Sequence, residues 1–413
     1  MRFPALRNLD IVPVQENGET MICLSDPEGY VDGQVALSGA AFFVAACLDG
    51  TTSATEISEA FLKQFGARIS DENIHKVVDS LDQTGFLYSE RFFALRTAAR
   101  KAFDALDARP AYLAGKSYPD DPAKLHDFLH DLLRTPNQAQ PNELAGPVRF
   151  LLAPHIDYAR GAPAYAAAYA RTDGSRPTRI FLFGVAHAGA ESPFVLTRKN
   201  FDTPLGTVHT DVDLVERLAN ACPWDPFESE LAHRTEHSIE FQAVMLAHQF
   251  ANRLDEIRIV PILCGPLSTD NVPDDPAAVA GVAEFLAACR DEARSDDVLV
   301  VAGADLAHVG RRFGDDFDVD ERVVRMVEAR DREDLELALK GDALGFYQSV
   351  MKDGNARKVC GFFCIYSALS TIDGAAEQGK LLHYGCAEDP AGGIVSFAGA
   401  GFPPKAGGDK NGK

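Results

Sequence analysis

The sequence is poor in positive charge. It has 40 Lys and Arg residues against 61 Asp and Glu residues, so its formal net charge is −21. A protein that binds the phosphate backbone of nucleic acid needs clustered Lys and Arg, and an anionic membrane surface repels a polyanion. The composition therefore argues against nucleic acid and membrane surfaces as partners.

Long apolar runs and paired cysteine motifs are also missing. No uncharged stretch approaches the roughly 20 residues that a membrane helix needs. The segment Met1 to Arg7 lacks the apolar core of a signal peptide. The eight cysteines are scattered without a CxxC pair, which favours free thiols in a reducing compartment. We therefore expect a cytoplasmic protein.

What is present indicates two folded parts, because 413 residues exceed one ordinary core. Helical periodicity predicts helices from Ser38 to before Asp49, over Ser53–Phe65 and from Asp71 to Thr84, and Gly85–Tyr88 resembles a following strand. We predict a small winged-helix-like α+β domain over residues 1–90, a helical connector over 91–109, an α/β domain over 110–404 and a disordered tail over 405–413.

The winged-helix pattern is typical of DNA-binding domains, but the charges of its helix argue against DNA binding. The candidate recognition helix carries four carboxylates against the single Lys76. Residues 49–87 resemble the small PqqD-type domains, which recognise leader peptides or partner enzymes. A plain structural appendage is the alternative.

From residue 148 onward the pattern changes to alternating strands and helices. The predicted buried strands are Val148–Ala153, Arg179–Val185, Ile257–Leu263, Val298–Ala302 and Ile394–Ala398. The predicted helices between them include Ala162–Arg171, Thr235–Phe250, Pro276–Arg290 and Glu321–Ala338. This alternation predicts a mostly parallel central sheet with helices on both faces. Ligands of such sheets collect beyond the carboxyl ends of the strands.

Three histidines stand at such strand ends. His155 follows the first predicted strand, His187 follows the second, and His308 comes shortly after the fourth, next to Asp305. One such His is usually an ordinary loop residue, whereas three at equivalent places in one sheet predict a common site.

Two helix starts add further candidates. Thr235 is the expected N-cap of the helix that follows it. Glu236 and Glu240 lie in the first turn, where a negative charge interacts favourably with the helix dipole, and we expect the Glu236 side chain to be solvated. His237 fits either a site residue or a satisfied histidine at the core edge. Cys360 stands where an apolar helix begins, a location that lowers a thiol pKa and favours the thiolate.

These residues carry a resemblance to the Memo family, whose bacterial and archaeal members are called AmmeMemoRadiSam system protein B. The shared features, in order, are Pro154-His155 with Gly161, Gly184 with His187, Thr203-Pro204-Leu205, Glu236-His237-Ser238-Ile239-Glu240, Asp305 with His308 and Gly310, and Cys360-Gly361. The resemblance covers roughly residues 110–402.

The resemblance implies roles for individual residues. The metal ligands would be His155, His187 and Cys360. The groups for acid–base chemistry or for orienting ligands would be His237, Asp305 and His308. We place Asp157, Tyr158 and Glu240 in the substrate pocket; Ile156-Asp157 replaces the family's usual Ala-Gly, which adds a carboxylate beside the site.

The resemblance also implies a fold and a chemistry. Family members are similar in fold to class III extradiol dioxygenases, which use non-haem iron, so we expect a metal-dependent oxidoreductase. Two imidazoles and a thiolate favour iron or copper, with zinc as the other option. The expected partners are an AMMECR1-like protein and a radical-SAM protein, and the expected substrate is a small molecule or a peptide.

Two other functions fit the same residues. A Cys–His hydrolase would pair Cys360 with His237 or His308, although it leaves His155 and His187 without a role. A non-catalytic adaptor would use the same pocket to bind a peptide or partner.

Overall fold

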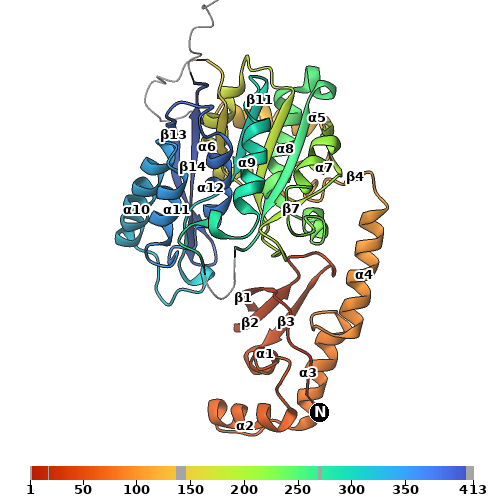
Figure 1. Ribbon diagram of the computed structural model, residues 1–413. Helices are drawn as coiled ribbons and strands as arrows, with labels where there is room; N and C mark the ends of the chain where they lie inside the picture. Colours follow the sequence, from red (N-terminus) through yellow and green to blue (C-terminus); the bar gives the residue numbers. More distant parts are fainter. Residues whose placement is uncertain (1, 17, 136–145, 268–271, 406–413) are drawn as a thin grey trace, which may run out of the picture. The chain divides into compact units, whose positions relative to one another are not determined.

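The computed structural model describes residues 2–16, 18–135, 146–267 and 272–405, and the chain divides into two compact units, Met1–Leu106 and Asp107–Lys413 (Figure 1). The predicted disordered tail lies outside the described residues from position 406 onward. Among the described residues, no helix combines the length and apolar character required to cross a membrane.

The N-terminal unit joins an antiparallel sheet to four helices. The strands are β1 (Asp10–Glu16), β2 (Glu19–Ser25) and β3 (Gln34–Ser38), in the order β1-β2-β3, and the helices are α1 (Gly39–Ala46), α2 (Ala54–Phe65), α3 (Asp71–Gln83) and α4 (Glu90–Asp104). Ser53 and Glu56 form a capping box at the start of α2, and Ile57 and Phe61 bury its inner face. The predicted helices are confirmed. The predicted strand at 85–88 is reduced to one bridge between Leu6 and Leu87, because the sheet is built from residues that precede α1.

The second unit is built on a sheet whose centre is parallel. The main strands are β5 (Phe150–Ala153), β6 (Arg179–Val185), β10 (Arg258–Cys264), β11 (Val298–Gly303) and β14 (Gly393–Phe402), and the shorter or outer ones are β4 (Ala108–Arg109), β7 (Phe194–Leu196), β8 (Asn200–Thr203), β9 (Gly206–Thr210), β12 (His308–Val309) and β13 (Lys380–Asp389). The strand order is β12-β14-β5-β11-β6-β10-β9-β8-β4, with β13 beside β14 and β7 beside β10. The pairs among β5, β11, β6 and β10 are parallel, whereas β14 runs antiparallel to β5.

Helices cover both faces of this sheet, as predicted. They are α5 (Pro122–Leu133), α6 (Tyr158–Tyr169), α7 (Val212–Ala219), α8 (His237–Gln249), α9 (Val282–Glu292), α10 (Glu321–Leu339), α11 (Ala343–Met351) and α12 (Phe362–Thr371), with 3-10 turns η1 (Ala170–Thr172), η2 (Glu230–Arg234), η3 (Ala251–Glu256), η4 (Pro276–Ala278) and η5 (Arg311–Phe313). On β6, Phe181 and Phe183 enter one core with α7, α9 and α12, and Ile180 and Leu182 enter another with α5, α6 and α8. Successive strand residues point to opposite faces, so both faces are buried.

Three helix starts differ from the prediction. The helix predicted over Pro276–Arg290 is divided into the 3-10 turn η4 and helix α9, which begins at Val282. Helix α6 begins at Tyr158 rather than Ala162, because the Asp157 carboxylate accepts a hydrogen bond from the Arg160 amide and caps it there. Helix α8 begins at His237, and its N-cap is Glu236 rather than Thr235.

Candidate metal centre

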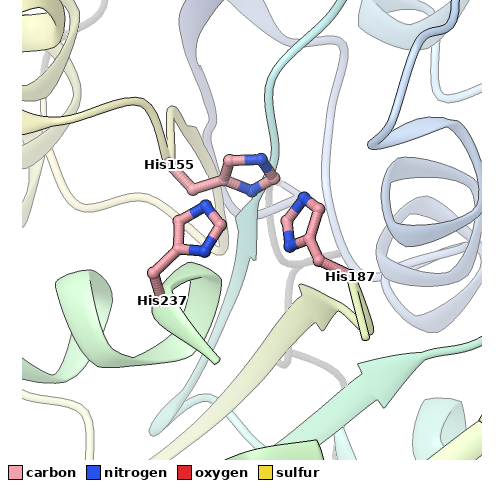
Figure 2. A group of neighbouring side chains, drawn as sticks. All are labelled: His155, His187 and His237. Atoms are coloured by element: carbon pink, nitrogen blue, oxygen red, sulfur yellow. The ribbon is translucent and has the colours of Figure 1, made fainter. Parts of the chain in front are cut away.

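The strand order places the predicted site residues at one edge of the sheet. Strands β5, β11 and β6 are neighbours, and they lead into His155, Asp305 and His187 respectively. The N-terminus of α8 brings His237 to the same edge. His155, His187 and His237 each offer one ring nitrogen, and these atoms all lie within 4.8 Å of one another, so the group could hold a metal ion. Figure 2 shows the three rings turned toward a common space.

The close approach of α8 to the sheet depends on small residues. A Cβ on Gly184 of β6 would lie 2.6 Å from the Ser238 hydroxyl, and one on Gly303 of β11 would lie 2.6 Å from the Ser238 carbonyl oxygen. Ser238 uses this space to accept a hydrogen bond from the Val185 amide at 2.9 Å. The two glycines therefore set how near His237, the first residue of α8, comes to the strand ends.

His155 lies at the base of the cluster, with 2% of its surface exposed. Its Nδ1 is 2.9 Å from the Gly303 carbonyl oxygen. Because a carbonyl oxygen only accepts, Nδ1 carries the proton and Nε2 offers its lone pair. Burial lowers the pKa of His155 to about 3, so the ring is neutral at pH 7, the form that ligates a metal.

Glu236 orients the other two imidazoles. Its Oε1 is 2.9 Å from His187 Nδ1 and 3.2 Å from His237 Nδ1, and its Oε2 accepts from the His187 amide at 3.0 Å. Burial alone would raise the pKa of Glu236, but the two histidines hold it well below its usual range. Burial would lower the pKa of His187, but Glu236 and Cys360 raise it well above its usual value, so a metal that binds Nε2 of this ring must displace a proton.

The prediction for Glu236 was wrong. It was expected in a solvated first turn, whereas its side chain is 4% exposed, accepts hydrogen bonds from His187 and lies 3.2 Å from His237 Nδ1. An acidic residue beside His237 is the only local signal for this role. Its contact with His187 joins residues 49 positions apart, which no local pattern reveals.

Cys360 also adjoins the cluster. Its Sγ is 3.3 Å from His155 Nε2 and 3.9 Å from the Asp305 carbonyl oxygen, and Gly361 after it is the N-cap of α12. Burial raises the pKa of the thiol, although His187 opposes this, so the expected lowering at the helix start is not found. The predicted ligand set therefore shares His155 and His187 with the histidine group, and Cys360 lies at its side.

Asp305 and His308 surround the same histidines. Asp305 Oδ1 accepts from the His155 amide at 2.9 Å, and burial raises the pKa of this carboxyl. His308 Nδ1 lies 3.1 Å from the Leu306 carbonyl oxygen and 3.2 Å from that of Lys358, so Nδ1 carries the proton. Burial lowers the pKa of His308 to about 4. The catalytic roles predicted for His237, Asp305 and His308 stay predictions.

The residues predicted for a substrate pocket are held by structural contacts. Tyr158 is buried and donates to the Phe241 carbonyl oxygen at 2.7 Å. Glu240 accepts from Tyr118 and from the Leu113 amide. Asp157 caps α6 and pairs with Arg160. A role for these three in substrate binding stays a prediction.

Sequence reasoning missed Arg109, whose side chain is fully buried behind α8. Its Nε donates to the His233 carbonyl oxygen at 2.6 Å, and its Nη2 donates to that of Glu236 at 2.9 Å. Nη2 also lies 2.5 Å from Glu240 Oε2. Arg109 thus fixes the backbone that carries Glu236 and His237.

The site has a closed side and an open side. His155 and Asp305 are each 2% exposed, whereas the side chains of His187 and His237 are each 35% exposed. A metal held by these rings would keep one side toward solvent, where a further ligand or substrate has access.

Comparisons with known proteins show the family of the chain. Residues 109–401 match the family model described as Memo-like protein. A MEMO1 family protein of Aquifex aeolicus is 28% identical over 401 residues, covering 97% of this chain and 99% of the relative. Those of Thermus thermophilus and Nitrosopumilus maritimus are 29% and 24% identical, over 63% and 71% of this chain and 72% and 98% of their own lengths. The chain therefore belongs to the Memo-like protein family.

Proposed function

We propose that this protein binds a transition metal through His155, His187 and His237, with Cys360 as a fourth donor, and performs metal-dependent oxidoreductase chemistry. The observation that carries the proposal is the clustering of the rings. The donor atoms of the three rings lie within 4.8 Å of one another, and Nδ1 of His155 and Nδ1 of His187 each have an oxygen acceptor.

The donor set fits a borderline or soft metal ion. Imidazoles suit iron, copper and zinc, and a thiolate shifts the preference toward softer ions such as copper. Hard cations such as Mg²⁺ prefer oxygen ligands, which are not the main donors here. We therefore favour iron or copper, with zinc as the other option. A bound metal would supply Lewis acidity and, for iron or copper, redox chemistry.

The chain's own residues would orient the site and move protons. Asp305 holds the His155 backbone, and Glu236 holds His187 and His237. His308 carries its proton on Nδ1, which leaves the Nε2 lone pair as an acceptor for a substrate proton. The exposed side of His187 and His237 is where a substrate would enter.

The Memo resemblance supports the finer parts of the proposal. It points to a dioxygenase-like reaction related to that of class III extradiol enzymes, to an AMMECR1-like protein and a radical-SAM protein as partners, and to a small molecule or a peptide as substrate. All eight cysteines are free, in keeping with a cytoplasmic location. The N-terminal unit has its own core, and we assign it the PqqD-like role of docking a peptide or partner.

Metal analysis of the full chain, purified without oxygen, tests the site. We expect about one equivalent of iron, copper or zinc in the wild type and a loss of at least about tenfold in occupancy for His155→Ala. The exposed control His75→Ala should retain the metal. Equal metal content in wild type and His155→Ala would refute the metal site.

Oxygen uptake tests the chemistry separately. The metal-loaded protein should consume O₂ when a catechol is added, and His308→Ala should slow this uptake while keeping its metal. Metal binding without uptake for any catechol tested would favour the adaptor function over the dioxygenase-like one.

A further inference from the structure

A second group of histidines lies at the other end of α8. His126 and His130 are on α5, and His248 is in the last turn of α8. The rings of His126 and His248 are 5.1 Å apart between centroids, and those of His126 and His130 are 6.2 Å apart. His248 is 11 residues after His237, so the two groups are about 16 Å apart along the helix axis.

One ring distance matches those of the candidate metal centre, whereas the other is longer, so binding requires the side chains to change rotamer. Ring centroids there are 4.5–5.1 Å apart, and the His126–His248 distance of 5.1 Å falls at the edge of this range. The longer His126–His130 distance joins two exposed residues four positions apart on one helical face, with ring planes only 8° apart. Exposed side chains change rotamer readily, and an i, i+4 pair of histidines is a spacing that binds zinc on helices.

The backbone beneath these histidines is fixed by packing. Leu125 and Leu129 of α5 are fully buried in the same core as Val244 and Met245 of α8. The two helices therefore present their histidines from a rigid base, and only the side chains need to adjust on binding.

His248 supplies the observation that points to a ligand. Its Nδ1 is buried without a hydrogen-bond partner among the described residues. A buried polar atom without a partner is energetically unfavourable, because it has lost its hydrogen bond to water and forms none within the protein.

The charged side chains of Asp127 and Arg134 lie beside these histidines. Asp127 Oδ1 lies 3.4 Å from His126 Nδ1, and Arg134 Nη1 lies 3.1 Å from His130 Nε2. The guanidinium only donates, so His130 Nε2 offers a lone pair there. Arg134 is exposed and can turn away, and Asp127 could serve as an oxygen ligand.

We propose that His126, His130 and His248 form a surface site for a divalent transition-metal ion of the Zn²⁺, Ni²⁺ and Cu²⁺ class. The bound ion ties α5 to the C-terminal end of α8 and so stabilises the helix that carries His237. The site is independent of the metal centre at the strand ends.

Zinc titration of the metal-free full chain by calorimetry tests this proposal. The wild type should bind one more Zn²⁺ than the double variant His126→Gln/His130→Gln, or bind it at least about tenfold more tightly. The exposed control His75→Gln should behave as the wild type. His248→Gln should also lose the ion, and Zn²⁺ should raise the Tm of His155→Ala but not that of the triple variant His126→Gln/His130→Gln/His155→Ala.

Two results would overturn the surface site. One is a double variant that matches the wild type in both the number and the affinity of Zn²⁺ ions. The other is a loss of the same size in His75→Gln, which would indicate nonspecific binding by surface histidines. Both outcomes are independent of the site at the strand ends, because that site keeps its residues in all the glutamine variants.

Discussion

Glu236 holds His187 at two points, through the backbone amide at 3.0 Å and the ring Nδ1 at 2.9 Å. The same carboxylate reaches His237 Nδ1 at 3.2 Å. One buried acid therefore fixes the orientation of His187 and contacts a second imidazole of the cluster. It stands in the position that ligand-orienting carboxylates take behind metal-bound histidines.

Loss of this carboxylate should weaken metal binding. In Glu236→Gln one carboxylate oxygen becomes an NH2 group that cannot accept, so either the His187 amide or the two rings lose their acceptor, and the negative charge beside the imidazoles is removed. We expect the metal Kd to rise about 10–100-fold, measured by competition with a chelator. The exposed Glu191→Gln, in the loop after β6, is the matched control. An unchanged Kd in Glu236→Gln would show that the carboxylate does not orient the ligands.

Arg109 should matter for stability because its charge is buried against Glu240. Arg109→Met leaves that carboxylate without its cation, and we expect the free energy of unfolding to fall by about 3–5 kcal/mol. The double variant Arg109→Met/Glu240→Gln removes both charges, so its free energy of unfolding should fall less than that of Arg109→Met. Denaturant unfolding of the metal-free proteins measures this difference. A double variant that loses the sum of the two single losses would contradict this pairing.

The buried His233 should make the metal-free protein sensitive to acid. Burial lowers its pKa to about 3, whereas an unfolded His titrates near 6.5. Between these values the unfolded chain binds the extra proton, so stability is present above pH ~6.5 and is lost as the pH falls toward ~3. The His233 contribution is about 1.4 kcal/mol per pH unit.

The variant His233→Gln removes that contribution. Its free energy of unfolding should therefore fall less steeply with decreasing pH than that of the wild type, measured by urea unfolding between pH 7 and pH 4.5. The two slopes would be equal if His233 were charged, or free to become charged, in the folded state.

Much of the α/β framework could be predicted from the sequence. Continuous apolar runs such as Arg179–Val185 are typical of strands buried on both faces, and β6 has those bounds. Parallel strands have their carboxyl ends at the same edge of a sheet. Because His155 and His187 each follow such a strand, the sequence predicted that they would lie close together. The antiparallel direction of β14 could not be predicted, because an apolar run has no directional signal.

The contacts that complete the site could not be predicted from local patterns. The sequence indicates only that Glu236 is an acidic residue in the first turn of a helix, where it interacts favourably with the helix dipole. Its contact with His187 depends on the fold. From the sequence, His237 fitted a position at the core edge equally well. In the structure, Gly184 and Gly303 allow α8 to approach the sheet closely, which places His237 in the site. Arg109 carries no local signal, because the partners through which it holds the start of α8 lie 124 to 131 positions later.

X-ray absorption spectroscopy of the metal-loaded protein tests the central claim most directly. The sample is the His126→Gln/His130→Gln variant with one equivalent of zinc, so that the surface histidines do not contribute. We predict three imidazole nitrogens at about 2.0–2.1 Å and one sulfur at about 2.3 Å, with the sulfur lost in Cys360→Ser. A shell of oxygen ligands alone, or one that is unchanged in His155→Ala, would contradict a metal centre built on His155, His187, His237 and Cys360.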